Sequence, residues 1–125
     1  MKREIKFKIF ADGKWYDKCL VGNTNNVEDN KWTCPMVWLE DKKEWVNCDN
    51  GIICQYTGLK DRYGVEIYEG DILREYSNEI EDWIVSYEHG SFIGTSDNVC
   101  EHLYEICDLE VIGNIYDALK ETGIR

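Results

Sequence analysis

The residues best suited to metal binding or catalysis lie in the segment CEHLYEIC, which contains Cys100, His102 and Cys107. Structural zinc sites favour pairs of ligands about two to four residues apart, and no two cysteines of this sequence have that spacing. The alternation of polar and apolar residues predicts a strand on which Cys100 and His102 share one face and Cys107 lies on the other. We therefore expect no metal site.

The same pair raises the question of catalysis, because a nucleophilic cysteine needs a base such as histidine beside it. Cys100 and His102 meet that need in the predicted strand, but the sequence indicates neither a third, orienting group nor an oxyanion hole. We expect no catalytic residue, no cofactor and no enzyme activity. A small enzyme that acts on a small molecule or a nucleic acid through this pair is the alternative.

Carboxylates are the second group that could serve a function, and they are unevenly distributed. Residues 1–50 hold nine Lys and Arg and nine Asp and Glu, whereas residues 51–125 hold five and sixteen and carry the whole net charge of −11. Such a charge repels phosphates, which argues against sequence-independent binding to nucleic acid. The predicted interaction surface consists of Glu75, Glu79, Glu81, Asp82, Glu88, Glu101, Glu105, Asp108 and Glu110.

Three interpretations of this acidic surface stay open. It could bind a basic host or phage protein, or it could mimic nucleic acid and inhibit a host protein that binds nucleic acid. It could also serve only solubility, because surface charge of one sign has no partner specificity by itself.

Short strands separated by turns are predicted to position these residues. Ile5, Phe7 and Ile9 alternate with charged residues, which is the period of a half-buried strand. Further strands are predicted over residues 14–16, 36–39, 44–46, 52–57, 82–87, 91–93, 103–107 and 109–116, and residues 66–73 carry a turn at 69–71 that leads into a strand. Hairpins are expected over 3–16, over 36–46 and, around the turn Glu88-His89-Gly90, over 82–93. A polar loop is expected over 22–30 and a short helix over 117–123. The pattern predicts a mainly β fold (β-rich α+β), either a small barrel or a curled antiparallel sheet, with an N-terminal β-hairpin region and a short C-terminal helix.

Four residues in the middle of the chain are typical of structural turns, namely Gly58, Gly64, Gly70 and Asp71. Glycine accepts the positive φ of tight turns, and Asp71 can accept hydrogen bonds from nearby backbone amides. Between the first two glycines, Lys60, Asp61 and Arg62 are expected to solvate the tip of a loop.

Three blocks of the sequence resemble the YopX-like family of phage and prophage proteins. They are REIKF at 3–7, QYTGLKDRYGVEIYEGDIL at 55–73 and EVIGNIYD at 110–117, in the order of the family. Residues 11–50 match no pattern of the family, and the tail departs from it after Tyr116. The resemblance implies a small β-rich accessory protein with an SH3-like barrel element that self-associates, and it brings no catalytic residue.

The length of 125 residues predicts a single YopX-like domain over 1–125, with a hairpin and loop portion at 1–50 and an acidic barrel-like portion at 51–125. No apolar run has the length of a signal peptide or a membrane span, so we expect a protein of the bacterial host cytoplasm whose six cysteines are thiols. We expect a non-catalytic protein-binding module that forms homo-oligomers and engages a basic host or phage protein. Binding to membranes or to non-specific nucleic acid is not expected.

Overall fold

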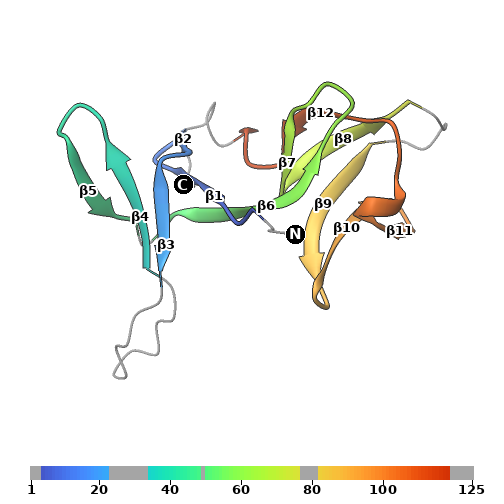
Figure 1. The fold of residues 1–125 in the computed structure, drawn as a ribbon, viewed down its shortest axis with the longest axis horizontal. Helices are drawn as coiled ribbons and strands as arrows, with labels where there is room; N and C mark the ends of the chain where they lie inside the picture. Colours follow the sequence, from blue (N-terminus) through green and yellow to red (C-terminus); the bar gives the residue numbers. More distant parts are fainter. Residues whose placement is uncertain (1–3, 23–33, 49, 77–81, 119–125) are drawn as a thin grey trace. The chain divides into compact units, whose positions relative to one another are not determined.

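A computed structural model describes residues 4–22, 34–48, 50–76 and 82–118, and its regular elements are almost all strands (Figure 1). In chain order the elements of this part are β1 (Phe7–Ala11), β2 (Lys14–Tyr16), β3 (Cys19–Gly22), β4 (Cys34–Leu39), β5 (Glu44–Asn47), β6 (Ile52–Lys60), β7 (Glu66–Tyr68), β8 (Asp71–Glu75), β9 (Trp83–Glu88), β10 (Ser91–Ser96), β11 (Val99–His102), the 3₁₀ turn η1 (Leu103–Glu105) and β12 (Leu109–Asn114). Among these residues no helix has the length and apolarity to span a bilayer. The predicted mainly β fold is confirmed.

The elements belong to two units. The N-terminal unit is Lys6–Cys54 and contains β1 to β5; the C-terminal unit is Gln55–Ala118 and contains β7 to β12. Strand β6 begins in the first and ends in the second. The division falls close to residue 50, where the charge of the sequence changes from balanced to acidic.

The N-terminal unit consists of a hairpin and a three-stranded sheet. Asp12 and Gly13 join β1 to β2. Both have positive φ, 52° and 76°, as in a type I′ turn, whose twist suits two antiparallel strands. Strands β3, β4 and β5 form the sheet in chain order. Ile9, Ala11 and Val37 are the buried centre of this unit. Both predicted hairpins are confirmed, and most of the polar loop predicted at 22–30 lies outside the described residues.

The C-terminal unit is built on a curled antiparallel sheet with the strand order β11-β10-β9-β8-β12 (Figure 1). His89 and Gly90 form a second turn of the I′ kind between β9 and β10, with φ of 53° and 80°. This sheet confirms the predicted curled antiparallel architecture. Most of the helix predicted at 117–123 lies outside the described residues.

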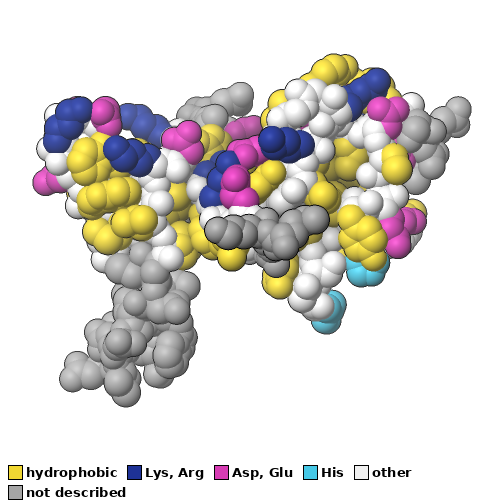
Figure 2. Space-filling view, in the orientation of Figure 1, with side chains coloured by type: hydrophobic (Ala, Val, Ile, Leu, Met, Phe, Trp, Pro, Cys, Tyr) yellow, Lys and Arg dark blue, Asp and Glu magenta, His cyan; other side chains and the backbone are white. Residues whose placement is uncertain are grey.

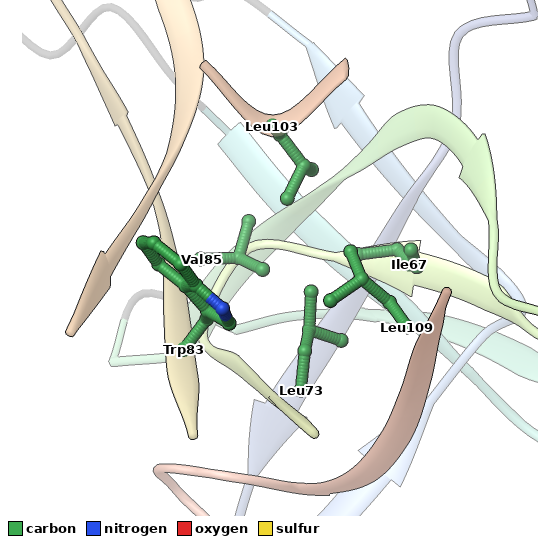
Figure 3. Close-up of a cluster of buried hydrophobic side chains, with 6 residues drawn as sticks. All are labelled: Ile67, Leu73, Trp83, Val85, Leu103 and Leu109. Carbon is green, nitrogen blue, oxygen red and sulfur yellow. The ribbon is translucent and has the colours of Figure 1, made fainter. Parts of the chain in front are cut away.

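One face of the curled sheet holds the core of the C-terminal unit. Leu73 of β8 pairs with Val111 of β12 and with Trp83 of β9, so these side chains lie on the same face. Ile67 and Leu103 close over them from β7 and η1 (Figure 3). The core therefore lies between the curled sheet and strands β6 and β7, which pair with each other in a separate sheet of order β2-β1-β6-β7.

Two local predictions were wrong. Residues 103–107 do not form a strand, because the chain turns at η1, where the N–H of Ile106 donates to the carbonyl of Leu103 at 3.2 Å. This turn brings the Leu103 side chain into the core. The loop expected from Gly58 begins only at Asp61, because β6 continues through Gly58. Gly58 has a φ of +87° where the pairing of β6 with β7 is irregular, so it serves a bulge.

Gly70 offers a test of how closely the turn between β7 and β8 is packed. Gly64 and Gly70 both have a φ of +83°, but a Cβ atom at Gly70 would lie 3.1 Å from Cε2 of Tyr116, whereas one at Gly64 would meet nothing within 4 Å. Gly64→Ala should cost about 1 kcal/mol for the φ alone, and Gly70→Ala should cost about 1–2 kcal/mol more. Urea unfolding of both variants measures the difference. Equal losses would contradict the close packing.

Candidate binding surfaces

Asp61 is the main polar anchor of the C-terminal unit. Its side chain is buried, with the residue only 8% exposed, and it accepts three backbone hydrogen bonds. Oδ1 accepts from the N–H groups of Tyr63 at 2.8 Å and Val65 at 2.9 Å, and Oδ2 accepts from Val111 at 2.9 Å. One carboxylate therefore closes the loop between β6 and β7 and also ties it to β12.

The environment of Asp61 keeps its carboxylate charged. Burial by itself raises the pKa of this carboxyl, but the three N–H donors together outweigh burial and hold the pKa below its usual value. The prediction that Asp61 solvates a loop tip was therefore wrong. Its neighbour Arg62 fits that prediction better, because its side chain is exposed while its N–H donates to the carbonyl of Leu109 at 2.9 Å.

Asp71 and Asn114 form a second buried polar pair. Oδ2 of Asp71 accepts from the N–H of Tyr68 at 2.7 Å, as predicted for a turn aspartate, and Oδ1 accepts from Nδ2 of Asn114 at 2.9 Å. Oδ1 of Asn114 in turn accepts from the N–H of Tyr116 at 2.9 Å. The pair joins the turn between β7 and β8 to the end of β12. The middle and late blocks of the sequence thus meet through structural hydrogen bonds.

An aromatic groove lies at the rim of the core of the C-terminal unit. We define the groove by five apolar residues that line two neighbouring hollows, Leu59, Tyr87, Phe92, Leu103 and Tyr104. The hollows have volumes of about 280 and 230 Å³ and share Leu59, Leu103 and Tyr104. Tyr87 and Phe92 are cross-strand partners whose rings meet edge to face at 4.8 Å. The groove is open and borders the hairpin β9-β10, and the smaller hollow is also lined by the charged residues Lys60, Asp61, Arg62 and Asp108.

Sequence analysis did not predict any residue of this groove. Tyr87 and Phe92 flank the predicted His89-Gly90 turn, so the register of that hairpin already places the two rings opposite each other. The register of the hairpin does not predict that Tyr104 lines the groove, because the position of Tyr104 depends on the unexpected turn η1.

The predicted carboxylates come from several elements of the C-terminal unit. Glu79 and Glu81 lie outside the described residues. The other seven are spread over four strands, η1 and two connecting segments, at Glu75, Asp82, Glu88, Glu101, Glu105, Asp108 and Glu110.

Several of these carboxylates already have partners. Asp82 lies 3.7 Å from Nε of Arg74, and Asp108 lies 3.4 Å from Nε of Arg62. Glu110 accepts a hydrogen bond from the phenol of Tyr76, and this bond is the main reason why the pKa of Tyr76 is raised. Ion pairs with arginine thus offset part of the negative charge of the C-terminal unit, at Asp82 and Asp108.

Cys100 and His102 do share a face, because they pair with Thr95 and Ile93 of β10 on the side away from the core. Nδ1 of His102 is hydrogen-bonded to Oγ of Ser91 at 3.1 Å, and its imidazole stacks on the Tyr104 ring at 5.3 Å. His102 therefore contacts Tyr104, which lines the groove, and makes no hydrogen bond to Cys100 among the described residues. In the described part of the chain no cluster of His, Cys, Asp and Glu is arranged to hold a metal ion.

The five cysteines whose side chains are described, Cys19, Cys48, Cys54, Cys100 and Cys107, are all free thiols.

These features define a class of small β-rich protein whose turns are tied by buried carboxylates and whose exposed features are apolar and aromatic surfaces. The sequence matches the model of the family described as YopX protein over residues 6–119, and the chain belongs to this family. The crystal structure of protein EF1440 from Enterococcus faecalis has a similar fold, with a TM-score of 0.63 and 20% sequence identity over 99% of this chain and 100% of that chain. A search of curated proteins found no match.

Replacing Asp61 tests the carboxylate anchor. Asp61→Asn should destabilise the protein by about 1–3 kcal/mol at pH 7, because an amide cannot replace all three charge-assisted acceptors. Since the folded pKa is depressed below the unfolded value of about 3.9, the stabilisation is complete above that pH and is lost as the pH falls through the folded pKa. The gap between the wild type and the variant should therefore narrow below about pH 4.

Urea unfolding across this pH range measures the effect, with Asp82→Asn as the control. Asp82 is exposed and only ion-paired, so its replacement should cost about 0.5 kcal/mol or less. A loss for Asp61→Asn that is no larger than for the control would show that the anchor does not stabilise the fold.

Proposed function

We propose that this member of the YopX family is a phage or prophage accessory protein that acts as a non-catalytic binding module. Its aromatic groove would bind a segment of a partner protein that carries both apolar and basic side chains. The observation that carries the proposal is the exposure of Tyr104, which is 68% accessible beside a hollow lined by Leu59 and Phe92. Large aromatic side chains beside a hollow are typical anchors of protein interfaces.

The groove is suited to binding because its shape exists before a partner arrives. The Tyr87 and Phe92 rings support each other, and Tyr104 is held by its stacking on His102. A partner that fills a preformed aromatic groove loses little affinity to the ordering of these side chains. Leu59 and Leu103 supply an apolar floor for its side chains.

Charge supports a basic partner. In the described residues of the C-terminal unit the cations are Lys60, Arg62 and Arg74, and both arginines face carboxylates already. Glu101 and Glu105 are exposed on the elements that lead to and contain Tyr104. An excess of carboxylates attracts basic partners and speeds their association, while the groove supplies the specificity that charge alone lacks.

The groove favours this proposal over the two alternatives. A nucleic-acid mimic needs a regular array of unpaired carboxylates, but Asp82 and Asp108 face arginines. For an enzyme that uses Cys100 and His102, the imidazole would have to act on the thiol, but in the described residues it is hydrogen-bonded to Ser91 and stacked on Tyr104, and no hydrogen bond joins it to Cys100. We further propose that the protein works in the bacterial cytoplasm and as a homo-oligomer, as the family resemblance implies.

Two matched tyrosine variants test the groove. Tyr104 and Tyr63 lie in the same unit with nearly equal exposure, 68% and 65%, but only Tyr104 lines the groove. Proteins captured from host lysate by the full-length wild type should be retained by Tyr63→Ala and lost with Tyr104→Ala, by about tenfold or more in recovered amount. Raising the salt concentration should reduce this capture, because the partner is basic. Light scattering of the complex gives its size.

Three results would contradict the proposal. The captured proteins could be retained by both variants, they could be lost equally from both, or they could be insensitive to salt. Circular dichroism of each variant checks that the loss of binding is not a loss of folding.

A further inference from the structure

The outer face of the sheet β3-β4-β5 in the N-terminal unit presents apolar side chains to solvent. Trp38 and Trp45 are cross-strand partners, and so are Leu20 and Met36. The alternate residues, such as Val37, turn to the other face and pack in the core of this unit. We call the four outward-facing residues Leu20, Met36, Trp38 and Trp45 the tryptophan face.

The tryptophan face is unusually exposed for its composition. Leu20 is 53% and Trp45 is 36% exposed, on the two edge strands of one small sheet, with Met36 and Trp38 of β4 between them. Figure 2 shows apolar side chains gathered over β4 and β5, with both Lys or Arg and Asp or Glu side chains at the end where these strands are joined. Contiguous apolar surface rimmed by charged residues marks an interaction site more often than does a single exposed leucine.

Trp38 is held in a fixed orientation. Its ring meets the Trp45 ring edge to face at 5.4 Å, and Nζ of Lys18 lies 4.3 Å from its centroid. Its indole N–H donates to the carboxylate of Glu40. A rigid indole offers a large contact area at little entropic cost, which makes it an effective anchor for a partner.

The charges around Trp38 favour an anionic partner. Nζ of Lys43 is 2.7 Å from Oε1 of Glu40, and Nζ of Lys18 lies over the Trp38 ring. Hydrogen bonds from Lys43 and Trp38 lower the pKa of Glu40, so this carboxylate is ionised and used within the face. Residues 40–44 include three acidic residues and two lysines, so the positive charge that this face offers to a partner is Lys18, which has no ion pair within 4 Å among the described residues.

We infer that the tryptophan face is a second docking site, which binds a segment of a partner protein with apolar side chains flanked by Asp or Glu. The apolar side chains of the partner pack on Leu20, Met36 and Trp45, and its carboxylate pairs with Lys18. The proposed ligand of this face is opposite in charge to the proposed ligand of the aromatic groove, and the face belongs to the other unit.

A peptide segment fits this face better than single-stranded nucleic acid does. Bases bind by stacking on free aromatic faces along a positively charged track. Here one face of Trp38 is covered by Lys18, and the neighbouring surface is made of the aliphatic side chains of Leu20 and Met36. The overall charge of −11 also opposes a polyanion, whereas one carboxylate of a peptide needs only the ammonium of Lys18.

The test is selection of a random peptide library on the immobilised full-length protein, followed by affinity measurement with the enriched peptides. Enriched sequences should combine Asp or Glu with aromatic or aliphatic residues. Trp45→Ser should weaken their binding by about tenfold or more. Leu20→Ser repeats the test from another strand in case the first variant fails to fold, and Tyr104→Ala is the control that should bind normally.

A charge reversal tests complementarity directly. A second selection on Lys18→Glu should enrich Lys or Arg in place of Asp or Glu. The inference is overturned if no peptide depends on Trp45 and Leu20, if basic peptides dominate the first selection, or if Lys18→Glu leaves the preference unchanged. It is also overturned if the face binds oligothymidylate, or if Trp45→Ser abolishes a concentration-dependent dimer, since nucleic acid or a second copy would then be the occupant.

Discussion

The hydrogen bonds that Asp61 accepts are the constraint on which the C-terminal unit depends. The pairs within β8, β9 and β10 are local hairpins or near neighbours, but the loop after β6 reaches β12 across a separation of 50 residues through this carboxylate. Without it, the N–H of Val111 and the amides of the loop would need other acceptors in a buried place, which is costly. Asp71 and Asn114 repeat the arrangement at the other end of β12. These hydrogen bonds hold β12 to the loop after β6 and to the turn before β8, next to the core and the groove.

This arrangement assigns the buried acidic residues of the middle block to the fold. The acidic residues of the middle block that are buried, Asp61 and Asp71, accept backbone and amide hydrogen bonds and leave no oxygen directed at a substrate. The residues that face solvent in the groove, such as Tyr87 and Tyr104, lie outside the three blocks by which the family resemblance was found. The recognisable residues thus build the fold, and the proposed binding residues are carried on it.

The sequence pattern predicted the structural features that depend on residues close to one another along the chain. The β1-β2 and β9-β10 hairpins, the turn at Asp71 and the common face of Cys100 and His102 all follow from alternation and turn chemistry. It failed for Asp61, because nothing in the local sequence indicates that Val111 will come within hydrogen-bond distance. It also missed the 3₁₀ turn at Leu103, where burial of one leucine decides the path of the chain.

The two proposed surfaces differ in the charge of the partner they would bind, but both depend on aromatic side chains held by neighbours. The central claim is that the Asp61 carboxylate holds three amides at once. A pH titration followed by NMR of the amide protons of Tyr63, Val65 and Val111 tests it most directly. The three signals should shift together, with one common midpoint below the usual aspartate value of about 3.9. Separate midpoints, or a common midpoint at or above that value, would contradict the claim.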